Sequence, residues 1–190
     1  MITHIPGFNT LATTATACLF VACLIFSPAA SAQVRSSESV RSSPNAVVGQ
    51  TIGTTDVTIT YGRPAVRDRV IFGELVPFDT VWRTGANEAT TITFSRDVTI
   101  EGEPLAAGTY GLFTIPRQNG EWTIIFNSTA EQWGAYRYEP GEDVLRVNVT
   151  ATEAPHTEQM QFLFEDAEGS SGKVVLSWKD VRVAFRIDEQ

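Results

Sequence analysis

The stretch that decides the fold is Gly108–Asn127, which reads GTYGLFTIPRQNGEWTIIFN. Its second half places Trp122, Ile124 and Phe126 at every other position, and this period of two is typical of a half-buried β-strand. The Asn119-Gly120 dipeptide separates the two alternating runs, and such dipeptides favour the tight turns of hairpins because both residues tolerate a positive φ. The stretch therefore predicts an antiparallel β-hairpin.

The same period of two recurs on both sides of this hairpin. Further alternating runs lie at residues 57–61, 92–100, 144–149, 160–164, 174–178 and 181–187. Turn residues separate them at Glu101-Gly102, Pro140-Gly141, Gly169–Gly172 and Lys179-Asp180. No segment has a sustained helical period, so we predict an all-β protein with a single domain over residues 46–188. The even spacing favours an antiparallel β-sandwich or jelly roll of about ten short strands.

The N-terminal segment predicts the compartment. Residues 1–32 contain no Lys, Arg, Asp or Glu, include the apolar run Ala15–Phe26 and end in Ala30-Ser31-Ala32. This pattern predicts a signal peptide that is cleaved after Ala32, and hence a periplasmic or secreted protein. The apolar run is shorter than the roughly 18 residues that a membrane span needs, so we expect no transmembrane helix in the mature chain. Lipidation at Cys23 is an alternative, which the continuation of the apolar run beyond this cysteine disfavours.

Composition limits what the mature chain can be. Residues 33–45 are rich in serine and predict a flexible leader ahead of the domain. Both cysteines lie within the predicted signal, so the mature chain has no thiol and must be stable through its hydrophobic core. The formal net charge of −8 makes nucleic acid an unsuitable partner, because binding to phosphates requires a basic surface.

The segment from Tyr61 to Thr90 interrupts the regular pattern of strands and turns. It combines four arginines and several carboxylates with the large aromatic side chains of Phe72, Phe78 and Trp82. We selected Arg63, Arg83, Asn87 and Glu88 as candidate polar contacts, because a guanidinium fork suits a carboxylate, a phosphate or a hydroxyl pair. A second connection, residues 127–138, carries Trp133 and Tyr136, whose rings could stack against a sugar or another amphipathic ligand.

These residues support two main functional hypotheses. In the first, the two connections meet and form a pocket that binds a small anionic or sugar-like ligand. In the second, the aromatic residues cap the sandwich, Glu88 pairs with Arg83 or Arg63, and the domain contacts a protein partner in the cell envelope. The first hypothesis predicts a binding module, and the second predicts a structural or interaction domain.

Catalysis is less favoured by the residue types present. The mature chain has one histidine, His156, and no cysteine, so neither a catalytic triad nor a zinc site is expected. We predict no metal, no cofactor and no catalytic residue. The carboxylates Glu74, Asp79 and Glu88 leave a third hypothesis open, an acid and base pair that hydrolyses a glycosidic bond.

Several motifs resemble a known family. They are Arg63-Pro64, the segment from Ile71-Phe72-Gly73 to Val76-Pro77, Trp82–Thr90 (WRTGANEAT) and Gln132–Tyr136 (QWGAY). Together they resemble the exported bacterial family known as domain of unknown function 2911, over roughly residues 43–187. The resemblance implies secretion, an all-β domain and no established activity, and it implies no catalytic residue in this chain.

Overall fold

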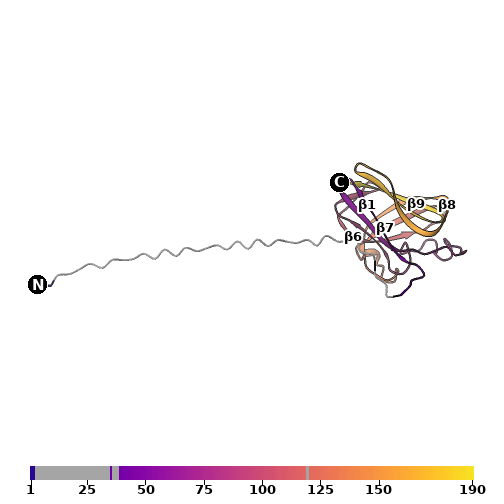
Figure 1. Ribbon diagram of the computed structural model, residues 1–190, viewed down its shortest axis with the longest axis horizontal. Coiled ribbons are helices and arrows are strands. Elements are labelled where there is room, and N and C mark those ends of the chain that lie inside the picture. The colour runs from indigo at the N-terminus through magenta and orange to yellow at the C-terminus, as the bar shows by residue number, and fades with distance from the viewer. Residues whose placement is uncertain (3–34, 36–38, 119) are drawn as a thin grey trace. The chain divides into compact units, whose positions relative to one another are not determined.

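The computed structural model describes residues 1–2, 35, 39–118 and 120–190 (Figure 1). The predicted signal peptide, Cys23 and the cleavage point after Ala32 lie outside the described residues. The described residues from Arg35 onward belong to one compact unit, which confirms the single domain. None of the described helical segments is long and apolar enough to span a membrane.

The described residues form a nearly all-β structure. Its elements in chain order are β1 (Asn45–Ile52), β2 (Thr55–Gly62), β3 (Thr90–Phe94), β4 (Val98–Ile100), β5 (Glu103–Leu105), β6 (Gly108–Ile115), β7 (Glu121–Asn127), the short 3-10 helix η1 (Pro140–Glu142), β8 (Asp143–Glu168) and β9 (Ser171–Glu189). The nine strands form one sheet in the order β1-β2-β3-β6-β7-β8-β9-β4-β5. All neighbouring strands are antiparallel, which confirms the predicted fold class. The hairpin quoted from the sequence is β6 and β7.

Two strands are longer than the sequence predicts. The runs at 144–149 and 160–164 belong to a single strand, β8, and the runs at 174–178 and 181–187 belong to β9 (Figure 1). The turn predicted at Lys179-Asp180 is therefore wrong. Lys179 has a φ of 56°, and the register between β8 and β9 shifts beside it. An extra residue of this kind bends a strand without reversing it, so a β-bulge accounts for the turn-like sequence.

The length of β8 lets one sheet provide two facing layers. Residues 143–150 of β8 pair with β7, whereas residues 151–168 pair with β9. Side chains of both parts meet in one core, where the Tyr61 ring of β2 lies 4.9 Å from the Phe162 ring of β8 in an edge-on contact. Strands that belong to different parts of the sheet therefore bury the same apolar surface, as in a β-sandwich.

The long connection between β2 and β3 is held against the sheet by backbone hydrogen bonds. The amide of Val66 donates to Glu158 of β8 at 2.8 Å, and the amide of Met160 donates to Pro64 at 2.9 Å. Further along, Trp82 pairs with Thr114 of β6 in both directions, at 2.8 and 2.9 Å. The connection between β2 and β3 is thus attached first to β8 and then to β6, and these hydrogen bonds place its polar side chains beside the core.

Candidate functional site

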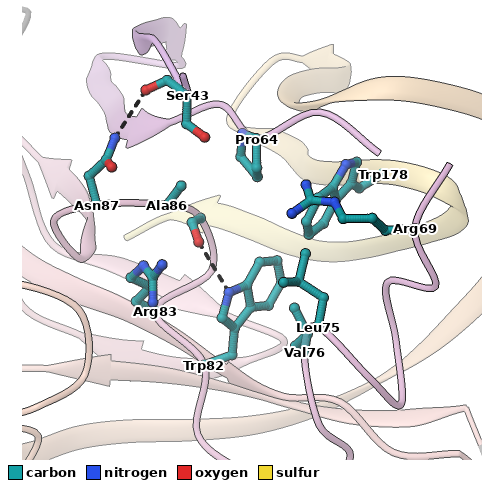
Figure 2. Close-up of a pocket in the computed structure, with 11 residues that line it drawn as sticks. Ser43, Pro64, Arg69, Leu75, Val76, Trp82, Arg83, Ala86, Asn87 and Trp178 are labelled. Carbon is teal, nitrogen blue, oxygen red and sulfur yellow. Dashed lines mark hydrogen bonds between the residues drawn. The ribbon is translucent and has the colours of Figure 1, made fainter. Parts of the chain in front are cut away.

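The connection between β2 and β3 encloses a cavity of about 280 Å³ (Figure 2). Three parts of the chain form its wall: the residue Ser43 ahead of β1, the connection itself, and Trp178 of β9. The lining residues are Ser43, Pro64, Arg69, Leu75, Val76, Trp82, Arg83, Gly85, Ala86, Asn87 and Trp178. The cavity therefore forms only when segments more than 130 residues apart in the sequence come together.

Two indole rings form the aromatic part of the wall. Trp82 and Trp178 stack with ring centroids 5.8 Å apart and an interplanar angle of 19°. The Nε1 of Trp82 donates to the carbonyl of Gly85 at 3.1 Å, which fixes the turn that follows it (Figure 2). Phe72 packs its edge against both indoles, at 6.1 and 6.0 Å. This cluster gives the cavity a rigid apolar side.

Arg83 is the most informative polar residue of the cavity. Its side chain is half-buried and makes no hydrogen bond or ion pair with any described residue, and its Nε is fully buried. Burial lowers the pKa of the guanidinium, and the nearby Tyr136 raises that pKa by a smaller amount. An arginine stays protonated in proteins even so, and a buried donor without a partner is costly. The fold thus holds an unpaired cation at the cavity.

A second unpartnered donor belongs to the same cavity. Trp178 is 2% exposed, and its Nε1 has no hydrogen-bond partner among the described residues. The described residues contain three such buried side-chain donors, and the third is the Nη1 of Arg35. Native structures satisfy nearly all buried donors, and two of these three unsatisfied donors belong to residues that line the cavity, although neither nitrogen itself is exposed.

Arg69 adds a second positive charge to the lining. Its Nε donates to the carbonyl of Val66 at 3.0 Å, and its Nη2 donates to that of Ala65 at 2.6 Å. These bonds anchor the guanidinium to its own turn, and no ion pair with a described carboxylate neutralises it. The cavity is therefore lined by two arginines and no acidic residue, although the whole protein carries a net charge of −8.

Asn87 closes the cavity on the side of the N-terminal segment. It adopts a φ of 65°, and its side-chain amide donates to the carbonyl of Ser43 at 3.0 Å (Figure 2). Its own carbonyl accepts from the amide of Gly134 at 3.0 Å. Asn87 thus joins three segments, and of the predicted contacts it and Arg83 are the two that line the cavity.

Arg63 and Glu88 lie outside the cavity lining. Arg63 donates its Nε to the carbonyl of Met160 at 2.9 Å and so ties the connection to β8. Glu88 forms a bidentate ion pair with Arg41, at 2.6 and 3.0 Å. The predicted alternative, in which Glu88 pairs with Arg83 or Arg63, is wrong because Arg41 occupies both carboxylate oxygens. The hydrogen bond from Arg41 is also the main reason why the pKa of Glu88 is lowered.

The segment predicted as a leader makes several contacts here. Besides Arg41, its residues Ser42 and Ser43 accept hydrogen bonds through their carbonyls, from the side chains of Arg67 and Asn87. The backbone amide of Arg63 donates to Pro44 at 2.8 Å. Residues 41–44 are thereby part of the wall beside the cavity.

The two connections meet, as the first hypothesis requires. Glu88 and Trp133 form an antiparallel bridge, and the amide of Ala89 donates to Gln132 at 2.9 Å. However, Trp133 is 56% exposed, Tyr136 is 85% exposed, and neither lines the cavity. The aromatic wall comes from Trp82 and Trp178 instead, so the two exposed rings stand at the surface near the site.

The sequence analysis did not select Arg69 or Trp178 for the site. Arg69 lies in the connection that was singled out, and its place beside two more arginines was an available signal. Trp178 follows the period of two in its strand and was therefore assigned to the core, where it is indeed buried. That its indole nitrogen lacks a partner is a property of the folded structure, which no local pattern reveals.

The carboxylates considered for hydrolysis do not gather at the cavity. None of Glu74, Asp79 and Glu88 is among its lining residues. Asp79 lies 3.7 Å from Arg117, with 77% of its side chain exposed. The geometry of these residues therefore adds no support to an acid and base pair.

The fold and the site define an all-β domain of one antiparallel sheet, with an arginine-lined cavity under its longest connection. The family described as "Protein of unknown function (DUF2911)" matches residues 43–187, and the chain belongs to this family. This confirms the resemblance seen in the sequence motifs. Neither the curated proteins nor the solved structures contain a match to the chain.

Proposed function

We propose that this protein is a binding module for a small anionic or sugar-like ligand, with the anionic class favoured, and that the ligand occupies the cavity beside Arg83. The observation that carries the proposal is the half-buried Arg83, whose Nε has no partner in a cavity without acidic residues. An anion that enters the cavity would pair with the charge of this guanidinium. Such charge-assisted hydrogen bonds are about twice as strong as neutral ones.

The size of the cavity supports a small ligand. Its volume of about 280 Å³ lies just below the usual range for ligand pockets, which is roughly 300–1,000 Å³. Its lining contains no Asp, Glu, His or Cys, so it offers no general base and no activated nucleophile. These features support binding over catalysis.

A thermal-unfolding screen tests the proposal. The protein is heated with a panel of organic acids, phosphates and saccharides, beside Arg83→Ala and the control Arg137→Ala. Arg137 is an exposed residue outside the cavity lining, and its replacement changes the net charge equally. A ligand at about a hundred times its Kd adds roughly 2.7 kcal/mol, which should raise the midpoint by about 5–10 °C.

We expect an anion to raise the midpoint of the wild type and of Arg137→Ala, but not that of Arg83→Ala. The proposal fails if no compound shifts the midpoint, or if Arg83→Ala responds as the wild type does.

A second candidate function follows from the exposed rings of Trp133 and Tyr136. Large aromatic side chains at a surface are enriched in the centres of protein interfaces. We propose this pair as the contact for an envelope protein partner. Crosslinking to a partner should be lost in a Trp133→Ser/Tyr136→Ser variant with an unchanged melting midpoint, and crosslinking that persists in this variant would exclude the pair.

A further inference from the structure

We infer that the ligand of the Arg83 cavity is a small organic carboxylate with an apolar body, and not a sugar or a phosphate. The inference rests on the proposed function, because it names the chemical class that this same cavity would take. Three observations support it: the free hydrogen-bond donors of the lining, the donors that already have partners, and the apolar side chains of the same lining.

The lining is rich in hydrogen-bond donors and poor in acceptors. Free donors come from the guanidinium of Arg83, while the side-chain acceptors are the amide oxygen of Asn87 and the hydroxyl of Ser43. A sugar presents hydroxyl groups, each of which donates as well as accepts, so its sites need acceptors for those protons. Glu88 would have been a suitable acceptor, but it pairs with Arg41 and does not line the cavity. The lining therefore fits a ligand that only accepts.

The two arginines differ in what they can still bind. The edge of Arg69 that carries Nε and Nη2 already donates to two backbone carbonyls. The two Nη groups of Arg83 are free, because the side chain makes no hydrogen bond with a described residue, whereas its Nε is fully buried and out of a ligand's reach. Two parallel N–H groups on one edge match the two oxygens of a carboxylate. Arg83 is thus the recognition residue, whereas Arg69 contributes charge from a fixed position.

Several backbone amides of the lining are not available to a phosphate-binding nest. Such nests present several free amide N–H groups to the anion. Here the amide of Val76 donates to Ile71 at 2.8 Å, and the amide of Ala86 donates to Gly62 at 3.2 Å. With these amides occupied, fewer donors remain to surround the three outer oxygens of a phosphate group. A planar anion with two oxygens fits them better.

The rest of the lining favours a hydrocarbon body on the ligand. The stacked pair Trp82 and Trp178 lies near the apolar side chains of Pro64, Leu75 and Val76 (Figure 2). An inorganic anion would leave this surface without a partner, but a ring or short chain attached to the carboxylate would cover it. The volume of about 280 Å³ limits that body to roughly one ring.

Four matched probes test the inference: benzoate, its neutral analogue benzamide, phenyl phosphate and inorganic phosphate. Binding is measured by tryptophan fluorescence, since two of the four tryptophans line the cavity, and by calorimetry. The variants are Arg83→Lys, which keeps the charge but loses the fork, Arg69→Lys, and the exposed control Arg137→Lys. Melting midpoints without a probe verify that each variant is folded.

We expect benzoate to bind at least about tenfold more tightly than benzamide and than either phosphate. Arg83→Lys should weaken benzoate by about tenfold or more, whereas Arg69→Lys should change it by about threefold or less. Equal affinity for benzoate and benzamide in the wild type would overturn the inference, and this comparison requires no variant.

The outcomes also separate this inference from the proposed function. If a phosphate binds more tightly than benzoate and depends on Arg83, the carboxylate class is wrong and an anion-binding site remains. If none of the four probes binds, the inference is refuted, and the wider panel of the thermal-unfolding screen then decides whether the proposed function stands.

Discussion

Replacing Arg63 and Arg83 by methionine should change stability in opposite directions. The two residues are the same type and lie in the same connection, but the Nε of Arg63 donates to the carbonyl of Met160 at 2.9 Å, whereas the Nε of Arg83 is buried without a partner. Methionine keeps an unbranched side chain and removes the donor and the charge. If Arg83 serves a ligand and Arg63 serves the fold, only the second substitution removes a stabilising interaction.

The magnitudes follow from the hydrogen bonds. A bond from a charged donor contributes about 1.5–3 kcal/mol, so Arg63→Met should lower the free energy of unfolding by about 2 kcal/mol. An unsatisfied buried donor costs about 1–3 kcal/mol, and because only the Nε of Arg83 is unpaired and fully buried, Arg83→Met should raise stability by about 1 kcal/mol. With about 2–4 °C per kcal/mol for a chain of this size, the midpoints should differ by roughly 6–12 °C.

Urea and thermal unfolding of both variants, without added ligand, measure this difference. Arg137→Met serves as the control for the loss of one exposed positive charge. If Arg83→Met lowers stability as much as Arg63→Met does, then Arg83 holds the fold together and the argument for a ligand loses its main support.

Two further predictions concern the surroundings of the cavity. A Cβ at Gly62 would lie 2.1 Å from the carbonyl oxygen of Ala86, so Gly62→Ala should lower the free energy of unfolding by about 1–3 kcal/mol. A Cβ at Gly141 would have nothing within 4 Å, so the control Gly141→Ala should change the free energy of unfolding by about 0.5 kcal/mol or less. Equal melting midpoints of the two variants would contradict this prediction. The ion pair with Arg41 lowers the pKa of Glu88 in the folded state below the unfolded value of about 4.3. The stabilisation of the fold by the charge of Glu88 is therefore fully present above the unfolded pKa and is lost as pH falls through the lower folded pKa. The difference in melting midpoint between the wild type and Glu88→Gln should therefore shrink between about pH 6 and pH 3, and a constant difference would show that the charge of Glu88 does not stabilise the fold.

Local patterns were sufficient for the fold class. Trp122, Ile124 and Phe126 all face the main core and are at most 2% exposed, but Ile125 between them is also fully buried in a second apolar cluster, so the strand is buried on both faces and not half-buried as predicted. The turn at Glu101-Gly102 was equally readable, because both residues have a positive φ in the structure. The Lys179-Asp180 turn failed because the same residue types also suit a β-bulge, and only pairing with β8 decides between a bend and a reversal.

The candidate site was predictable in part. Arg83 and Asn87 stood out because a long polar connection with large aromatic residues has no other explanation in the strand pattern. The partner of Glu88 was out of reach, since Arg41 lies 47 residues away in a serine-rich stretch whose composition predicts no fixed contacts. The period of two assigned Trp178 to the core, and its ring is indeed buried. The period does not predict whether its Nε1 has a hydrogen-bond partner.

The sequence by itself determined the antiparallel all-β domain, the family and the connection in which a site should be sought, because strand period, turn chemistry and family motifs are properties of neighbouring residues. The tertiary structure alone decided which arginine holds the fold and which remains free. That distinction depends on whether a carbonyl from another strand lies within hydrogen-bond distance. For Arg63 the carbonyl of Met160 does, and for the Nε of Arg83 no described acceptor does, although Arg83 lines the cavity in the same connection.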